Sequence, residues 1–98
     1  MRQARALDEA GLWPNYAWGQ CAYRERRYQE ALSAFSVCVG AAAAVPGVNP
    51  ANIHYNLAVV RLKLNDTGAA LEELQLAQRY QPDHPHAAAL RARLEAGR

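Results

Sequence analysis

The chain repeats itself at an interval of 39 residues. Residues 16–19 (YAWG) return as 55–58 (YNLA), and residues 31–38 (ALSAFSVC) return as 70–77 (ALEELQLA). Because two separate motifs keep one offset, the distance between them is the same in both copies. A fixed period of this length indicates two copies of one supersecondary unit.

Each copy contains two helical patterns, in which apolar residues step by three and four along one face. In the first copy these residues are Trp18, Cys21 and Ala22, followed by Tyr28, Ala31, Leu32, Phe35, Cys38 and Val39. In the second copy they are Leu57, Ala58, Arg61 and Leu62, followed by Ala70, Leu71, Leu74 and Ala77. We therefore expect each copy to be a helical hairpin.

The turn residues differ between the two copies. Asn65 tolerates the left-handed backbone that ends a helix, and Asp66 can cap the helix that follows. The first copy has Glu25, Arg26 and Arg27 at this place. These residues are poorer in turn chemistry, so we expect the weaker joint there. The basic run 24–27 is interpreted as a solvated helix end.

The predicted fold class is all-α, with antiparallel helix-hairpin repeats and five to six helices. Pro14 and Pro50 fit helix starts, where a missing N–H costs nothing. Helices are expected at 14–25, 28–44, 51–64, 67–80 and 85–96, with a short helical segment at 2–10. The predicted organisation is a single domain, 1–98, with repeat 1 at 12–45, repeat 2 at 51–84 and a closing helix at 85–96.

Composition excludes several classes of protein. Hydrophobic residues make up 51% of the chain, but 21 of them are alanine, which predicts closely packed helices rather than a large aromatic core. The net charge of +2 favours neither nucleic acid nor membrane binding. No apolar run reaches the roughly 18 residues that span a bilayer, and the N-terminus does not resemble a signal peptide. The cellular compartment is not determined by these features. The cytoplasm is favoured, or the chain is a soluble fragment of a larger protein.

Groups that carry chemistry are few. Cys21 and Cys38 are predicted to be buried small hydrophobes that do not pair. His84 and His86 are interpreted as surface-turn residues, because their spacing does not place two ligands on one helical face. His54, which precedes Tyr55 on the first turn of a helix, is interpreted as a groove or cap residue. Glu72 and Glu73 are adjacent on a helix and point in different directions. We expect no enzyme activity, no metal and no cofactor.

These patterns resemble the tetratricopeptide repeat (TPR) family, a 34-residue helix–turn–helix repeat, over roughly residues 12–84. The second copy matches through 55–58, Ala70, Leu74, Ala77 and Pro82, and the first through Trp18, Gly19, Tyr23, Tyr28, Ala31, Phe35 and Cys38. Gly19 and Ala58 are expected to allow a close helix crossing opposite Ala31 and Ala70. The 39-residue spacing departs from the family and predicts an irregular joint at 40–50. Helix 85–96 resembles the solvating helix that closes such arrays.

The resemblance implies a concave groove, lined by the first helix of each repeat, that binds a peptide or a partner helix. The positions carried over are Trp13, Tyr16, Gln20, Tyr23, Arg24, Asn52, Tyr55, Val59, Leu62 and Lys63. The residues alone support part of this set, because the spacing of Tyr16, Gln20 and Tyr23 recurs 39 residues later. The alternative is that Tyr16 and Tyr55 pack between neighbouring helices.

Some family members grip a carboxylate with a basic cluster. Asn56 matches one such position, but Tyr16 and Gln20 stand where Lys and Asn are expected. A complete carboxylate clamp is therefore not predicted, and the groove is expected to be apolar and aromatic with a basic edge.

Two functions from different classes follow. The first is a protein-interaction module without catalysis, whose partner is a protein or peptide. The second is a structural scaffold that self-associates, as a homo-oligomer, or forms part of a longer TPR array, because Leu12, Trp13 and Tyr16 near one end are large for an exposed surface.

Overall fold

The computed structural model describes residues 12–42 and 48–97, and this part of the chain contains five helices and no strand. The helices are α2 (Leu12–Arg24), α3 (Tyr28–Ala42), α4 (Pro50–Lys63), α5 (Thr67–Tyr80) and α6 (Pro85–Ala96). The all-α prediction is confirmed. The segment predicted at 2–10, and the end of the second predicted helix beyond residue 42, lie outside the described residues.

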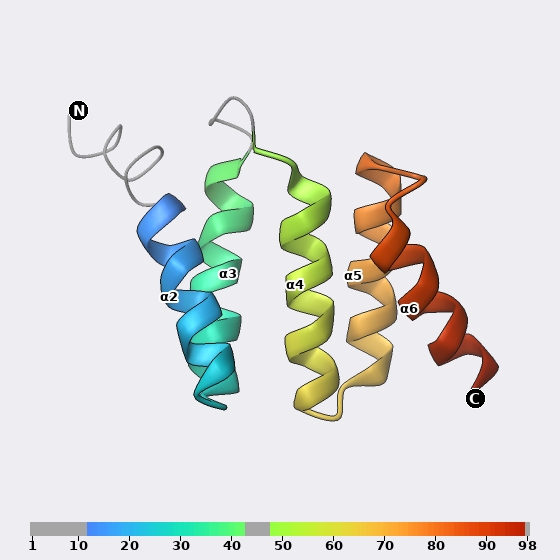
Figure 1. Cartoon of the computed structure of the whole chain (residues 1–98), viewed down its shortest axis with the longest axis horizontal. Coiled ribbons are helices and arrows are strands. Elements are labelled where there is room, and N and C mark those ends of the chain that lie inside the picture. Colours follow the sequence, from blue (N-terminus) through green and yellow to red (C-terminus); the bar gives the residue numbers. More distant parts are fainter. Residues whose placement is uncertain (1–11, 43–47, 98) are drawn as a thin grey trace. The chain divides into compact units, whose positions relative to one another are not determined.

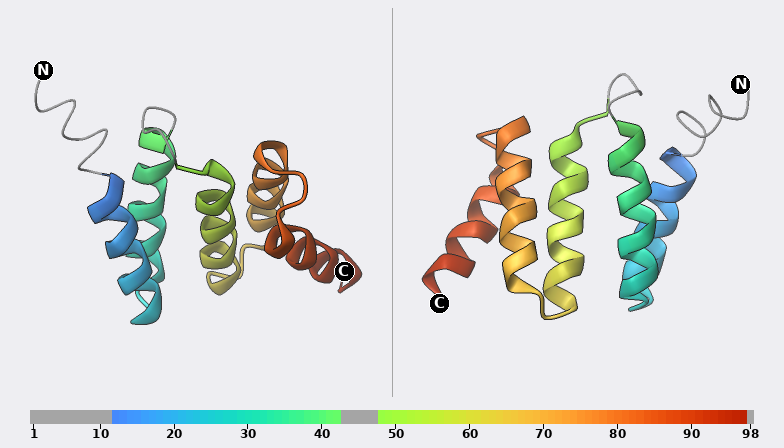
Figure 2. Two further views of the ribbon diagram at one scale, coloured as in Figure 1. Left: turned by 45° about the horizontal axis from the view of Figure 1, so that its top comes forward. Right: turned by 180° about the vertical axis from the view of Figure 1, so that it is seen from behind.

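The chain divides into two compact units, residues 1–49 and residues 50–98. In the first unit α2 and α3 form an antiparallel hairpin, and in the second α4 and α5 do the same (Figure 1). Helix α6 then packs obliquely against α5 (Figure 2). Among the described helices none is both long and apolar enough to cross a membrane. The prediction of a single domain over 1–98 stays a prediction.

Helix α2 begins at Leu12, two residues before the predicted start, so Pro14 lies inside its first turn. The first four N–H groups of a helix have no acceptor within the helix, so proline at the third position removes no hydrogen bond. Pro14 therefore correctly indicated the first turn of the helix, but the predicted first residue was wrong.

The first unit is held together by a close approach of backbone and ring. A Cβ atom built on Gly19 would lie 2.8 Å from Cε1 of Phe35, and its three nearest neighbours are all atoms of this ring. The ring of Phe35 therefore covers Gly19. At the other end of the hairpin the thiol of Cys38 donates a hydrogen bond of 3.4 Å to the carbonyl of Leu12. All these residues are buried.

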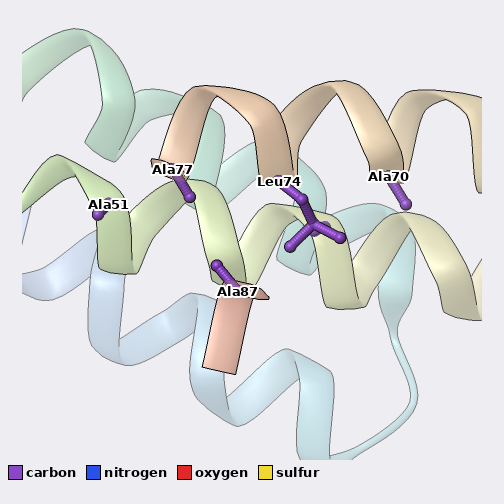
Figure 3. Packing of buried hydrophobic residues seen from close by; sticks show 6 residues of the cluster. Ala51, Ala70, Leu74, Ala77 and Ala87 are labelled. Atoms are coloured by element: carbon purple, nitrogen blue, oxygen red, sulfur yellow. The ribbon is translucent and has the colours of Figure 1, made fainter. Parts of the chain in front are cut away.

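The second unit packs around small side chains. Ala70, Leu74 and Ala77 project from α5 toward α4 (Figure 3). Ala51 and Ala58 on α4 and Ala87 on α6 belong to the same buried cluster. Five of these positions, all except Ala87, lie 39 residues after a buried residue of the first unit, so both hairpins use one packing scheme.

Equivalent positions in the two cores differ in side-chain size in a compensating way. Gly19 and Phe35 in the first unit correspond to Ala58 and Leu74 in the second. A smaller residue on the first helix accompanies a larger one on the second helix, which keeps the summed volume at the crossing similar. Volume-conserving exchanges are the ones that close-packed cores tolerate best.

Both hairpin turns have the same backbone structure. Arg26 has φ 65 and Asn65 has φ 64, the left-handed conformation. In each turn the N–H of this left-handed residue donates to the carbonyl three residues before it. The N–H of the following residue donates to the carbonyl five residues before it: Arg27 to Ala22 (2.8 Å) and Asp66 to Arg61 (2.9 Å). This is the Schellman pattern, which usually has glycine at the left-handed position.

The two turns differ in side chains as predicted. Asp66 caps α5 by accepting a hydrogen bond of 3.2 Å from the N–H of Ala69. In the first turn Arg27 instead pairs with Glu25 and Glu30, and hydrogen bonding to Glu25 raises the pKa of its guanidinium. The basic run is thus partly neutralised by its acidic neighbours.

Replacing Arg26 by glycine is expected to stabilise the protein. A side chain costs about 1–2 kcal/mol in the left-handed region, and glycine removes this cost. Glycine also raises the entropy of the unfolded chain, which reduces the gain in stability by about 0.4–1 kcal/mol. The net gain should be on the order of 0.5–1 kcal/mol in urea unfolding. Asn65→Gly is the matched control and should gain less, because asparagine tolerates this conformation. Equal gains at both positions would contradict the argument.

Adding one methyl group at Gly19 is expected to destabilise the protein. The new Cβ would clash with the ring of Phe35, and overpacking of this kind costs about 1–3 kcal/mol. Gly40→Ala is the control, because a Cβ at Gly40 meets nothing within 4 Å and alanine favours the helix. Gly40→Ala should therefore be neutral or stabilising in the same urea unfolding experiment. Recovery in the double variant with Phe35→Leu would locate the clash.

Candidate functional site

The aromatic residues predicted on α2 contact one another. Trp13 is 54% exposed, and its ring meets the ring of Tyr16 edge-on at 6.3 Å between centroids. Tyr16 is half-buried and packs in turn against Phe35 at 5.8 Å. The alternative reading of Tyr16 as a packing residue therefore holds for one side of its ring, while Trp13 extends this packed pair to the surface.

The remaining α2 positions lie near the hairpin turn. Tyr23 is half-buried and contacts the ring of Tyr28 on α3 at 5.7 Å. Gln20 and Arg24 are exposed, and Arg24 lies 3.6 Å from the thiol of Cys21. The α2 surface is thus aromatic along its length and basic at its C-terminal end.

On α4 the predicted residues are tied to the closing helix. Asn52 is exposed on one side, and its Oδ1 lies 2.7 Å from Nε2 of His84. The half-buried Tyr55 stacks on His84 at 5.6 Å and contacts His86 at 5.8 Å. The structure therefore brings Asn52 and Tyr55 together around one histidine.

Further along α4, Val59 and Leu62 are half-buried and Lys63 is exposed. Tyr55 and Leu62 pack against the alanine-rich cluster of the second unit, as do Leu90 and Leu94 of α6. Leu90 and Leu94 were not singled out from the sequence, because 85–96 was interpreted only as a solvating helix. The spacing of Ala87, Leu90 and Leu94 by three and four was the available signal.

His54 is a core residue, which corrects its reading as a groove or cap residue. It is buried, and its Nδ1 lies 2.9 Å from Oε1 of Glu73 on α5. The other carboxylate oxygen of Glu73 accepts a hydrogen bond of 3.3 Å from Nε of Arg61. The ring of His54 also stacks on Tyr80. This network joins α4 to α5, and Glu72, its exposed neighbour, takes no part in it.

His84 is buried as well, which corrects its reading as a surface-turn residue. It is the N-cap of α6, and its Nδ1 accepts a hydrogen bond of 3.1 Å from the N–H of Ala87. Its position directly before Pro85, the first residue of the helix, was the signal for a cap. His86 is exposed, as expected for a surface residue.

The two cysteines have different environments. Cys38 is buried, and burial raises the pKa of its thiol to about 11. Cys21 is exposed, which contradicts its prediction as a buried residue. Both thiols are free, as predicted. The described residues hold no group of three or more His, Cys, Asp or Glu side chains that could bind a metal ion.

Trp18 is also misplaced by the sequence pattern. It is 49% exposed, although it was grouped with the inward residues of the first helix. The face that α2 buries instead contains Leu12, Gly19 and Ala22. Gly19 and Ala22 on the buried face are less apolar than Trp18 on the exposed face. The apolar pattern of the sequence therefore indicated the wrong face of α2 as the buried one.

Two antiparallel hairpins in one register, followed by a packed helix, define a helical repeat protein of the solenoid class. The family model described as Tetratricopeptide repeat matches residues 22–94, more than half of the chain. The chain therefore belongs to the tetratricopeptide repeat family, whose members are in general protein-interaction modules. Comparison with curated proteins found no match, and comparison with solved structures found none either.

Proposed function

We propose that this chain is a protein-interaction module that binds a peptide or a partner helix along the first helices of its repeats, α2 and α4, and catalyses no reaction. The contact of Trp13 with Tyr16 carries the proposal. A half-exposed tryptophan supported by a tyrosine that is itself packed on the core is a rigid anchor, and such aromatic residues dominate binding energy at interfaces.

The α4 surface adds apolar and polar contacts. Tyr55, Val59 and Leu62 offer apolar area, Asn52 an amide, and Lys63 a charge at the end of the helix. Leu90 and Leu94 of α6 are half-buried against the same alanine-rich cluster as Tyr55 and Leu62. A ligand with apolar side chains and an acidic end fits these groups best.

The chemistry of the polar residues supports binding over catalysis. His54 and His84 are engaged in hydrogen bonds that join helices. The thiolate of a cysteine, not its thiol, is the nucleophile, and burial keeps Cys38 protonated near neutral pH by raising its pKa. These groups serve the fold.

A peptide selected from a displayed library on the immobilised chain tests the proposal. Trp13→Ala should weaken its binding in a calorimetric titration by about thirtyfold, the loss expected of an interface anchor worth about 2 kcal/mol. Val37→Ala is the control, since Val37 is an exposed apolar residue on α3, and it should leave the affinity unchanged. If Trp13→Ala and Gln20→Ala both fold and bind the peptide with unchanged affinity, the proposal that α2 forms the binding surface is refuted.

Self-association is the second candidate function, and one comparison within the chain favours it. The α2 residues Pro14, Trp18 and Cys21 are exposed, but their equivalents 39 residues later are all buried. These equivalents are Ile53 (2% exposed), Leu57 (3%) and Val60 (0%). A second copy that covers the face of Trp18 would bury it as its equivalents are buried.

Sedimentation equilibrium tests this second function. The wild-type chain should show a mass that rises toward the dimer with concentration, and Trp18→Glu should keep it monomeric. Trp13→Glu is the matched control on the same helix and should still associate. A wild-type chain that stays monomeric at the highest concentrations would exclude self-association, without bearing on peptide binding.

A further inference from the structure

Both ring nitrogens of His84 are used, and together they define one form of the ring. Nδ1 accepts a hydrogen bond from the N–H of Ala87, so Nδ1 carries no proton. The neutral ring must then carry its proton on Nε2, which donates to Oδ1 of Asn52 at 2.7 Å. The cap of α6 and the link from α6 to α4 therefore depend on the same neutral imidazole.

Three features of the cap make it depend on the neutral form of this ring. A proton on Nδ1 would point at the N–H of Ala87 and replace an acceptor by a donor. The N-terminus of a helix carries partial positive charge, so a cation at the cap is unfavourable. The residue is 4% exposed, and a buried charge loses its hydration.

The neighbouring groups do not compensate a positive charge. From α4, the ring meets the neutral amide of Asn52 and the phenol of Tyr55. From α6, it meets His86 at 5.9 Å, a second imidazole that adds like charge when it too is protonated. Asp83 precedes His84 in the chain and is exposed to solvent. The last ring of α5, Tyr80, stacks on His54 instead.

We propose that His84 is an acid-sensitive latch that holds α6 on the second repeat. Near neutral pH the latch is closed, and both hydrogen bonds form. Uptake of a proton removes the cap of α6 and loosens the helix. Because Leu90 and Leu94 pack on the alanine-rich cluster of the second unit, release of α6 uncovers part of that cluster. The latch is a property of the fold and holds whether or not α4 binds a ligand.

The test is amide hydrogen exchange of the full chain at pH 7.5 and pH 5.0, corrected for the intrinsic rates. The opening constant of α6 should rise about tenfold at the lower pH in the wild-type chain, the factor associated with loss of a helix cap, while the amides of α2 and α3 do not change. His84→Asn keeps a good cap that does not titrate in this range, so its α6 should change less than twofold. His86→Asn, the matched control, should respond like wild type.

An equal acid response in His84→Asn, loss of the response in His86→Asn, or no response in the wild-type chain would overturn the proposal. The ring nitrogens of the wild-type chain provide a second measurement that needs no variant. Their ¹⁵N shifts should report a proton on Nε2 alone at pH 7.5, and the second proton should appear at the pH at which α6 opens. A proton on Nδ1 while α6 is closed would overturn the latch.

Discussion

The structure depends on the close approach of the two helices within each hairpin. In the first unit this approach requires a residue without a side chain at Gly19, because the ring of Phe35 occupies the place of a Cβ atom. In the second unit Ala58 and Leu74 fill the equivalent space. Dispersion and the removal of apolar surface from water reward such contact only when atoms touch. The alanine-rich composition is therefore a requirement of the packing and not a neutral background.

Polar residues distinguish the second unit from the first. His54, Glu73 and Arg61 form a partly buried link between α4 and α5. Their equivalents in the first unit are Asn15, Ala34 and Ala22, which cannot form this network. His84 adds a link between α4 and α6. Buried polar groups of this kind are costly unless they are satisfied, and here each of these side chains has a partner.

The candidate binding residues serve two purposes. Tyr16 and Tyr55 each pack a ring against the fold, on Phe35 and on His84, and both are only half-buried. A ring that is already immobilised loses little entropy on binding. The reading of these tyrosines as packing residues is therefore compatible with their proposed role as ligand contacts, and the contact with Tyr16 supports the proposed anchor Trp13.

The sequence by itself determined the helices that the structure describes, the repeat and the place of both hairpin turns. Periodicity, proline positions and the 39-residue register are local signals, and the left-handed residue at Asn65 and the cap at Asp66 follow from their own side chains. Tertiary structure decided which face of a helix is buried. Trp18 and Cys21 are exposed although their equivalents Leu57 and Val60 are buried, and His54 and His84 are buried because distant partners satisfy them. Spacing cannot predict such contacts, since they arise only when separate helices meet.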